Sequence, residues 1–181
     1  MTNTIYNTIN FAPTADATQA RFDRARNSKL VMNGNRVLKT AKAGQIEREV
    51  DMLTQARAAG INVPHVKQVD SRTLSLQFIP HGQTMFDYLD HGKMTKALMG
   101  KIKAEIIKFW RAGFVHGDLH LNNILINEET EEVFIIDLAS SFNLGVLEEV
   151  FGVDPENAAE VRKGQQDDKE AFLKALSEFN S

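Results

Sequence analysis

The most regular pattern near the start of the chain is a pair of short apolar runs separated by a turn dipeptide. The runs cover residues 29–32 and 35–39, and Asn33 and Gly34 lie between them. Asn and Gly tolerate the positive φ angles of a tight type I′ turn, so the pattern predicts a β-hairpin. Residues 1–20 carry almost no charge and show no periodicity, which is typical of a flexible N-terminal arm.

A helix and a further strand are predicted next. Over residues 44–59 the apolar side chains recur at intervals of three and four, which places them on one face of a helix. Gly60 follows, and glycine is the residue type that most often ends a helix. Residues 72–79 alternate between apolar and polar, as a half-buried strand requires, and Pro80 ends the run.

The second half of the chain is richer in helical periodicity. An amphipathic helix is predicted over residues 94–112, followed by two apolar strands at 123–126 and 133–136 that the polar residues 127–132 join as a turn. A last helix is predicted to begin at Asp154 and Pro155, because Asp is a good cap and Pro suits the first helical position. Its apolar stripe consists of Phe172, Ala175, Leu176 and Phe179.

These elements predict an α+β fold in one globular unit. The chain has 181 residues, of which 43% are hydrophobic, enough for one substantial core or two small lobes. We expect a small antiparallel sheet with one helix over residues 21–79 and a mainly helical part over 80–181.

Composition narrows the classes of partner. The formal net charge is −3, so the chain lacks the overall positive field with which proteins hold nucleic acid or an anionic membrane. With no cysteine it has no disulfide and no thiolate metal site, and any metal should be bound by oxygen. No apolar run reaches the roughly 20 residues of a membrane span, so we expect a cytoplasmic protein, with export as an effector left open.

The segment with the clearest chemistry runs from His116 to Ile126 and is followed by Asp137. Asn123 lies five positions after Asp118, and Asp137 lies 19 positions after it, at the end of the second predicted strand. Phosphoryl transfer needs a carboxylate near the acceptor hydroxyl and oxygen ligands for Mg²⁺. Because Asp118 precedes one strand of the predicted ribbon and Asp137 follows the other, both carboxylates should lie at the same end of it.

The run His116-Gly117-Asp118-Leu119-His120, with Asn123 and Asp137, resembles the protein-kinase-like superfamily. The sequence of this motif is similar to that of aminoglycoside and choline phosphotransferases and, more loosely, to that of RIO-type and other small atypical kinases. The resemblance implies a two-lobed kinase-like fold that uses ATP with Mg²⁺, or with Mn²⁺ as an alternative. Asp118 would act on the acceptor hydroxyl, and Asn123 and Asp137 would hold the metal.

The same resemblance implies roles for residues outside the catalytic loop. Lys39 would neutralise the ATP phosphates, and Glu49 would hold its ammonium group, with Glu47 as a weaker second choice for that acid. Phe78 and Ile79, next to the crossing between lobes, would contribute to the nucleotide pocket.

Three further residues are expected to support the catalytic loop. His116 is predicted to be a buried scaffold, His120 to reach a phosphate or stack at the site, and Asp168, with Asp167 as its alternative, to accept hydrogen bonds from the loop backbone.

Departures from the family pattern keep several functions open. No G-x-G-x-x-G precedes Lys39, and Asp137 is followed by Leu138-Ala139 instead of Phe-Gly. The favoured interpretation is that the chain is an ATP-dependent kinase acting on a Ser or Thr hydroxyl of a protein. A kinase-shaped binding module that works through a protein partner, and a small-molecule kinase, are the alternatives. Either a protein substrate or an activating partner is expected, and the oligomeric state is left open.

Overall fold

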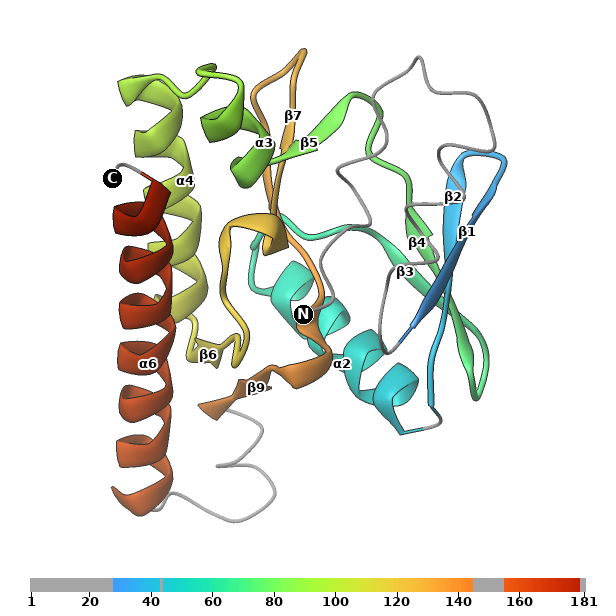
Figure 1. The fold of residues 1–181 in the computed structure, drawn as a ribbon. Coiled ribbons are helices and arrows are strands. Elements are labelled where there is room, and N and C mark those ends of the chain that lie inside the picture. The colour runs from blue at the N-terminus through green and yellow to red at the C-terminus, as the bar shows by residue number, and fades with distance from the viewer. Residues whose placement is uncertain (1–27, 43, 145–154, 180–181) are drawn as a thin grey trace.

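The computed structural model describes residues 28–42, 44–144 and 155–179. The predicted N-terminal arm and the predicted cap at Asp154 lie outside the described residues. Within the described residues, strands and one helix come first, and the second half contains two long helices with short strands and turns before and between them (Figure 1).

The N-terminal sheet has four antiparallel strands in the order β1-β2-β4-β3. They are β1 (Lys29–Asn33), β2 (Arg36–Thr40), β3 (Val66–Asp70) and β4 (Thr73–Gln77). The predicted hairpin is confirmed: β1 and β2 pair so that Asn33 faces Arg36, and Gly34 in the turn has a φ of 61°. The sheet places Lys39 near the end of β2 with its side chain buried.

Helix α2 (Gln45–Ala58) lies against this sheet. Its first turn is closed by Glu47, whose carboxylate accepts a hydrogen bond from the backbone N–H of Gly44. The buried face consists of Ile46, Glu49, Met52, Leu53 and Ala56, so a single acid stands among apolar residues. The helix also packs against the short 3₁₀ turn η2 (Leu138–Ser140), and this contact brings Glu49 close to Asp137.

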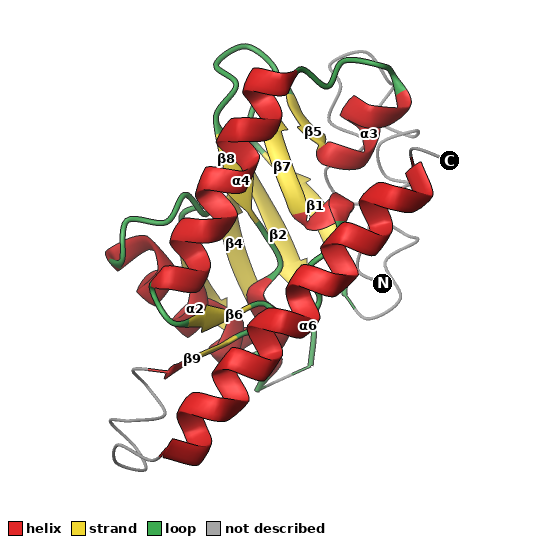
Figure 2. Ribbon diagram, turned by 90° about the vertical axis from the view of Figure 1, so that its left-hand side faces the viewer, coloured by secondary structure: helices red, strands yellow, loops and turns green. Residues whose placement is uncertain are grey.

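The second half is built on α4 (Lys96–Arg111) and α6 (Pro155–Phe179). The two helices lie side by side, on the opposite side of the molecule from the four-stranded sheet (Figures 1 and 2). Thr95 caps α4 by accepting a hydrogen bond from the N–H of Leu98. Phe172 of the predicted apolar stripe is buried in the core between the helices and the adjacent strands.

Two small sheets connect these parts. Strands β5 (Gly82–Thr84), β7 (Ile124–Asn127) and β8 (Val133–Ile135) form one of them, and β6 (Phe114–Val115) pairs with β9 (Phe142–Asn143) in the other. The predicted pairing of the strands on either side of residues 127–132 is confirmed by the β7–β8 ladder. The short helix α3 (Met85–Asp90) and the 3₁₀ turn η1 (Leu121–Asn123) complete the fold.

Asn62 ties the two halves together, in the segment after α2. Its backbone N–H donates to Glu105 Oε1 of α4 at 2.6 Å, and its side-chain Nδ2 donates to the carbonyl of Val133 at 2.9 Å. Its own carbonyl accepts from Ile135 N at 2.9 Å. The described residues therefore form an α+β, two-lobed fold of the small kinase-like kind, with α2 anchored to the second lobe.

Across the described residues, no helix combines the length and the apolar character that a bilayer span requires.

Candidate active site

The catalytic loop leaves β6 through a tight turn at Gly117. The φ of Gly117 is 74°, and a Cβ atom on this residue would lie 2.7 Å from the carbonyl oxygen of Ser140. Only glycine fits both the left-handed conformation and the contact. Asp168 of α6 fixes the same turn, because its carboxylate accepts hydrogen bonds from His116 N at 2.7 Å and Gly117 N at 3.0 Å.

His116 is completely buried beneath the loop. Its Nε2 lies 3.0 Å from the carbonyl oxygen of Ile136, and since a carbonyl only accepts, Nε2 carries the proton. Ser141 Oγ donates to the His116 carbonyl at 3.1 Å. Burial lowers the pKa of His116 despite the nearby Asp168 carboxylate, so the ring is neutral at neutral pH. Through these contacts His116 connects the catalytic loop to Ile136, the residue before Asp137.

A hydrogen bond within the catalytic loop connects the side chain of Asn123 to the backbone of Asp118. Asn123 Nδ2 donates to the Asp118 carbonyl at 2.9 Å and lies 3.1 Å from His120 Nε2. The Asp118 carboxylate is 39% exposed, with Oδ2 3.7 Å from His120 Nε2. That distance is too long for a hydrogen bond, but the imidazole lowers the pKa of Asp118, which is therefore ionised and accessible at neutral pH.

Asn123 and Asp137 supply oxygens of the kind that Mg²⁺ prefers. The Ile136 N–H donates to the Asn123 carbonyl at 3.0 Å, so the two segments are adjacent. Asn123 is fully buried, and its Oδ1 has no hydrogen-bond partner among the described residues, as expected of an atom reserved for a ligand. Asp137 has a left-handed backbone with φ 62° and ψ 63°, a conformation that is costly for a non-glycine residue and is concentrated at functional sites.

No cluster of three or more His, Asp or Glu side chains that could hold a metal ion occurs in the part of the chain that the structure describes. A metal at this site would have Asn123 and Asp137 as its protein ligands and would take its remaining ligands from water or substrate. Mg²⁺ is characteristically bound in this way, through one or two protein oxygens together with phosphates. The residues present therefore fit a nucleotide-associated Mg²⁺ ion.

Lys39 lies between two carboxylates at the centre of the site. Its Nζ is 2.8 Å from both Oε1 and Oε2 of Glu49 and 2.8 Å from Oδ1 of Asp137. The three side chains are 3%, 2% and 7% exposed, so the ammonium is shielded from water. Burial opposes the charged form of Lys39, but the two carboxylates outweigh it and raise the pKa to about 12. Burial raises the pKa of Glu49, and Lys39 opposes that shift.

A pocket of about 270 Å³ opens onto this ion triad. Gly117 and Asp118 are among the residues that line it, and so is Ser28, which directly precedes β1. Ser28 is 8% exposed, and its Oγ has no hydrogen-bond partner among the described residues. The sequence analysis did not name the Ser28 hydroxyl as a ligand, because a single serine carries no periodic signal.

Two of the predicted nucleotide contacts stay predictions. Neither Phe78 nor Ile79 is among the described residues that line it. The side chain of Ile79 is 1% exposed and belongs to the N-terminal core, and its carbonyl accepts from Gly82 N at 3.2 Å. Glu47, the second choice as the partner of Lys39, instead caps α2.

Comparison with known proteins agrees with this geometry. Residues 9–148 match the RIO domain. The chain belongs to the RIO-domain family. The match includes the catalytic loop, Asp137 and the Lys39–Glu49 pair, and it ends before α6.

Three relatives illustrate the range of proteins to which this chain is similar. A probable bifunctional tRNA threonylcarbamoyladenosine biosynthesis protein of Thermoplasma acidophilum is 36% identical over 95 residues, which is 51% of this chain and 17% of that protein. The EKC/KEOPS complex subunit bud32 of Dictyostelium discoideum is 28% identical over 114 residues, 58% of this chain and 45% of the subunit. A 3-deoxy-D-manno-octulosonic acid kinase of Vibrio vulnificus is 33% identical over 97 residues, 49% of this chain and 41% of the kinase.

The chain thus spans less than half the length of each of these relatives. Membership of the RIO-domain family supports an ATP-dependent activity of the atypical kinase or ATPase type. The names of the relatives differ in what they act on, so the family does not define the acceptor.

Proposed function

We propose that this protein is an atypical ATP-dependent kinase that transfers the γ-phosphate of Mg-ATP to the hydroxyl group of a Ser or Thr side chain. The observation that carries the proposal is the position of Lys39, which lies 2.8 Å from both Glu49 and Asp137 in a pocket that Asp118 also lines. A buried cation, a metal-ligand carboxylate and an accessible carboxylate are the parts that phosphoryl transfer requires.

Lys39 and Ser28 would bind the phosphates of the nucleotide. The Lys39 ammonium is held in place by Glu49, so little side-chain entropy remains to be lost when it contacts phosphate oxygens. Ser28 Oγ, buried and facing the same pocket, would donate a further hydrogen bond. These contacts offset in part the absence of a Gly-rich loop before Lys39.

Asp137 and Asn123 Oδ1 would hold Mg²⁺, which when bound neutralises charge on the transferred phosphoryl group. The Asp137 carboxylate, whose Oδ1 accepts a hydrogen bond from Lys39, would then contact both the lysine and the ion. The left-handed backbone of Asp137 and the contact of His116 with Ile136 fix the direction of that side chain in advance.

Asp118 would orient the acceptor hydroxyl and take its proton. Its pKa is low, so the carboxylate is ionised across the neutral range and acts mainly by positioning, with proton transfer late in the reaction. His120 lies beside Asp118, with its Nε2 3.7 Å from Asp118 Oδ2.

The proposal is tested by replacing Asp118 with Asn. We expect phosphotransfer to fall by at least about 10²-fold, the usual contribution of a positioned base, while Mg-ATP binding persists. The measurement is release of labelled phosphate, or its transfer to protein, together with nucleotide binding by calorimetry. Undiminished transfer by the Asp118→Asn variant would contradict the assignment.

A second candidate function is a binding module that acts through a protein partner. The departures from the kinase pattern favour it, and two relatives are named as KEOPS complex subunits. The buried Asn123 Oδ1, which has no hydrogen-bond partner among the described residues, and the buried Lys39 triad argue against it, because a scaffold has no need to bury them.

A small-molecule kinase remains a further alternative, and the Vibrio vulnificus relative carries a name of that kind. A cytoplasmic location stays a prediction.

A further inference from the structure

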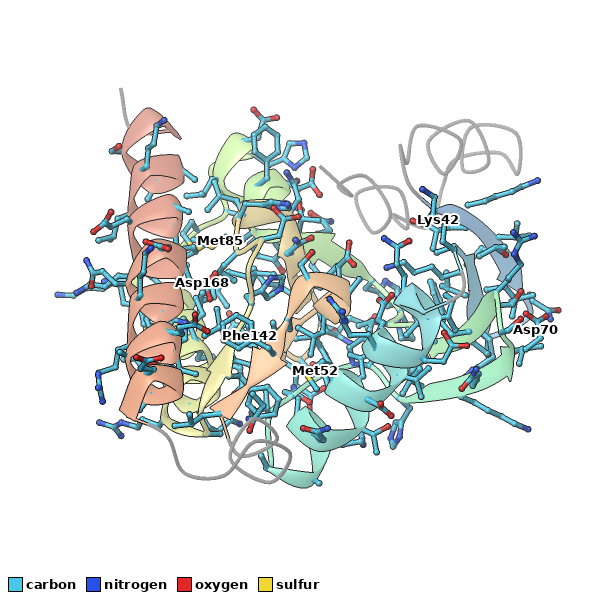
Figure 3. The ribbon with its side chains drawn as sticks, turned by 90° about the horizontal axis from the view of Figure 1, so that it is seen from below. Lys42, Met52, Asp70, Met85, Phe142 and Asp168 are labelled. Carbon is cyan, nitrogen blue, oxygen red and sulfur yellow. The ribbon has the colours of Figure 1, made fainter. Side chains whose placement is uncertain are left out.

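A second cavity lies between the catalytic loop and α6. It has a volume of about 420 Å³, and it shares Gly117 and Asp118 with the Lys39 pocket. Phe142 of β9 and Ala171 of α6 contribute to its described lining, whereas no residue of the N-terminal sheet does. Figure 3 shows Asp168 on the inward side of α6 and Phe142 in the space between α6 and the side of the molecule that carries α2.

The two cavities meet at the residue that would handle the acceptor. In phosphoryl transfer the attacking and leaving oxygens are roughly in line, on opposite sides of the phosphorus. The Lys39 pocket takes the phosphate end of the nucleotide, so the acceptor must approach Asp118 from the other side. The cavity along α6 reaches Asp118, and Lys39 is not among the described residues that line it.

The lining of this cavity has a definite charge. Among the described residues that line it there are three carboxylates and one histidine, and no Lys or Arg: Asp118, Asp167, Asp168 and His120. Asp168 is buried, and its carboxylate accepts hydrogen bonds from the loop backbone. Asp167, one residue before it on α6, is exposed. Val115, Leu119 and Phe142 give the cavity an apolar floor. The excess of carboxylates in this lining disfavours an anionic acceptor.

We infer that the α6 cavity is the acceptor site and that it selects a hydroxyl group carried next to a positively charged group. The Asp167 carboxylate would attract that positive group. This inference rests on the proposed function. The hydroxyl oxygen forms a bond to the γ-phosphorus, and the bond from that phosphorus to the β–γ bridging oxygen breaks. The hydroxyl proton goes to Asp118, and ADP leaves with the electron pair.

Two sources carry this chemistry, a Ser or Thr beside Lys or Arg in a protein and a small amino alcohol. The volume of the cavity falls within the range of pockets that hold small ligands, and it also admits one side chain with its neighbour. The experiment therefore includes both sources, each matched with a probe of opposite charge.

The test uses the full chain with labelled Mg-ATP and four probes. Two are Ser peptides that differ only in having Arg or Glu next to the Ser, and two are small hydroxyl compounds, ethanolamine and glycerate. We expect the cationic member of at least one pair to be the better acceptor by about two- to fivefold or more in kcat/KM, the value of one exposed charge pair. Labelling of the Arg peptide identifies the protein source, and labelling of ethanolamine the small-molecule source.

Variants of α6 link the preference to the cavity. Asp167→Lys should reverse the order of kcat/KM for the two members of the labelled pair. Ala171→Phe, which narrows the cavity, should raise the KM for the acceptor. Glu170→Gln is the matched control, because Glu170 is exposed on the same helix, pairs with Gln166 and does not line the cavity. Its acceptor preference should equal that of the wild type.

Failure of this inference can be separated from failure of the proposed function. If Mg-ATP stabilises the protein and is turned over, but the anionic probe is equal or better, or no cationic probe is labelled, the acceptor inference is overturned and nucleotide chemistry stands. The same holds if Asp167→Lys leaves the order unchanged. If Mg-ATP neither binds nor turns over, the proposed function itself fails and the acceptor inference fails with it.

Discussion

Lys39 shows how much the site depends on charge pairing within a buried volume. Its ammonium lies 2.8 Å from Glu49 and from Asp137, and all three groups are almost inaccessible to water. Removing one partner from a buried pair is costly because the other charge stays behind without compensation.

Replacing Lys39 with Met should therefore lower the free energy of unfolding by about 3–5 kcal/mol, since it leaves Glu49 uncompensated in the core. Urea denaturation of the variant and the wild type measures the change.

The control for this prediction is the double variant Lys39→Met with Glu49→Leu. Because it also removes the stranded carboxylate, we expect it to be more stable than Lys39→Met alone. A double variant that is no more stable would show that the loss comes from packing around the lysine and not from the unpaired acid.

At the residue scale, sequence reasoning named most of the groups that the structure brings together around Lys39. Glu49, Asp118, Asn123 and Asp137 lie in or next to one pocket. It ranked Glu49 above Glu47, which lies about half a turn away, and tertiary contacts account for the difference: Glu47 caps the start of the helix, and Glu49 is buried in the core. Phe78 and Ile79 were assigned by position along the chain, which does not reveal that Ile79 is buried.

At the scale of elements, the catalytic loop depends on Gly117. Substitution by Ala would force a side chain into a left-handed backbone and place its Cβ 2.7 Å from the Ser140 carbonyl. We expect Gly117→Ala to be destabilising by about 1–3 kcal/mol and to weaken Mg-ATP binding, because η2 and Asp137 must shift. Thermal unfolding and nucleotide titration check both effects.

Gly34 provides the comparison for that prediction. It also has a positive φ, 61°, but a Cβ on it would meet nothing within 4 Å. Gly34→Ala should therefore show the backbone cost alone and leave Mg-ATP binding intact. Equal losses in both variants would mean that the contact with Ser140 is unimportant.

The sequence predicted best the elements with a clear local signal. Helices α2 and α4 have apolar periods that extend over several turns, and the β7–β8 hairpin has continuous apolar runs on either side of a polar turn. Strand β3 was missed because four of its five residues are exposed, and β5, β6 and β9 were missed because two or three residues cannot show a period. The six-residue α3 is likewise too short for a helical stripe.

At the scale of the whole molecule, buried His116 makes stability depend on pH. Its pKa is lowered in the folded protein from an ordinary value of 6.5. Below that value the unfolded chain binds a proton that the native protein excludes, so the free energy of unfolding should fall as the pH decreases. The slope contributed by one such group is up to about 1.4 kcal/mol per pH unit.

Chemical denaturation from about pH 7.5 to about pH 5.5 measures this slope. His116→Gln keeps a donor for the Ile136 carbonyl but does not titrate, so its slope should be smaller than that of the wild type. His91→Gln, at an exposed position, is the control and should retain the wild-type slope. If His116→Gln were as pH-dependent as the wild type, another group would be responsible.

The central claim is that Asp137 and Asn123 form the metal end of an ATP site. A thermal-shift titration with ATP, with and without Mg²⁺, tests it on the wild type and on Asp137→Asn, a substitution that Asn tolerates at the left-handed φ of 62°. The account predicts Mg²⁺-dependent stabilisation of the wild type, about 2.7 kcal/mol at a hundred times the dissociation constant, and its loss in the variant. Equal stabilisation of both proteins, or none in the wild type at saturating Mg-ATP, would contradict it.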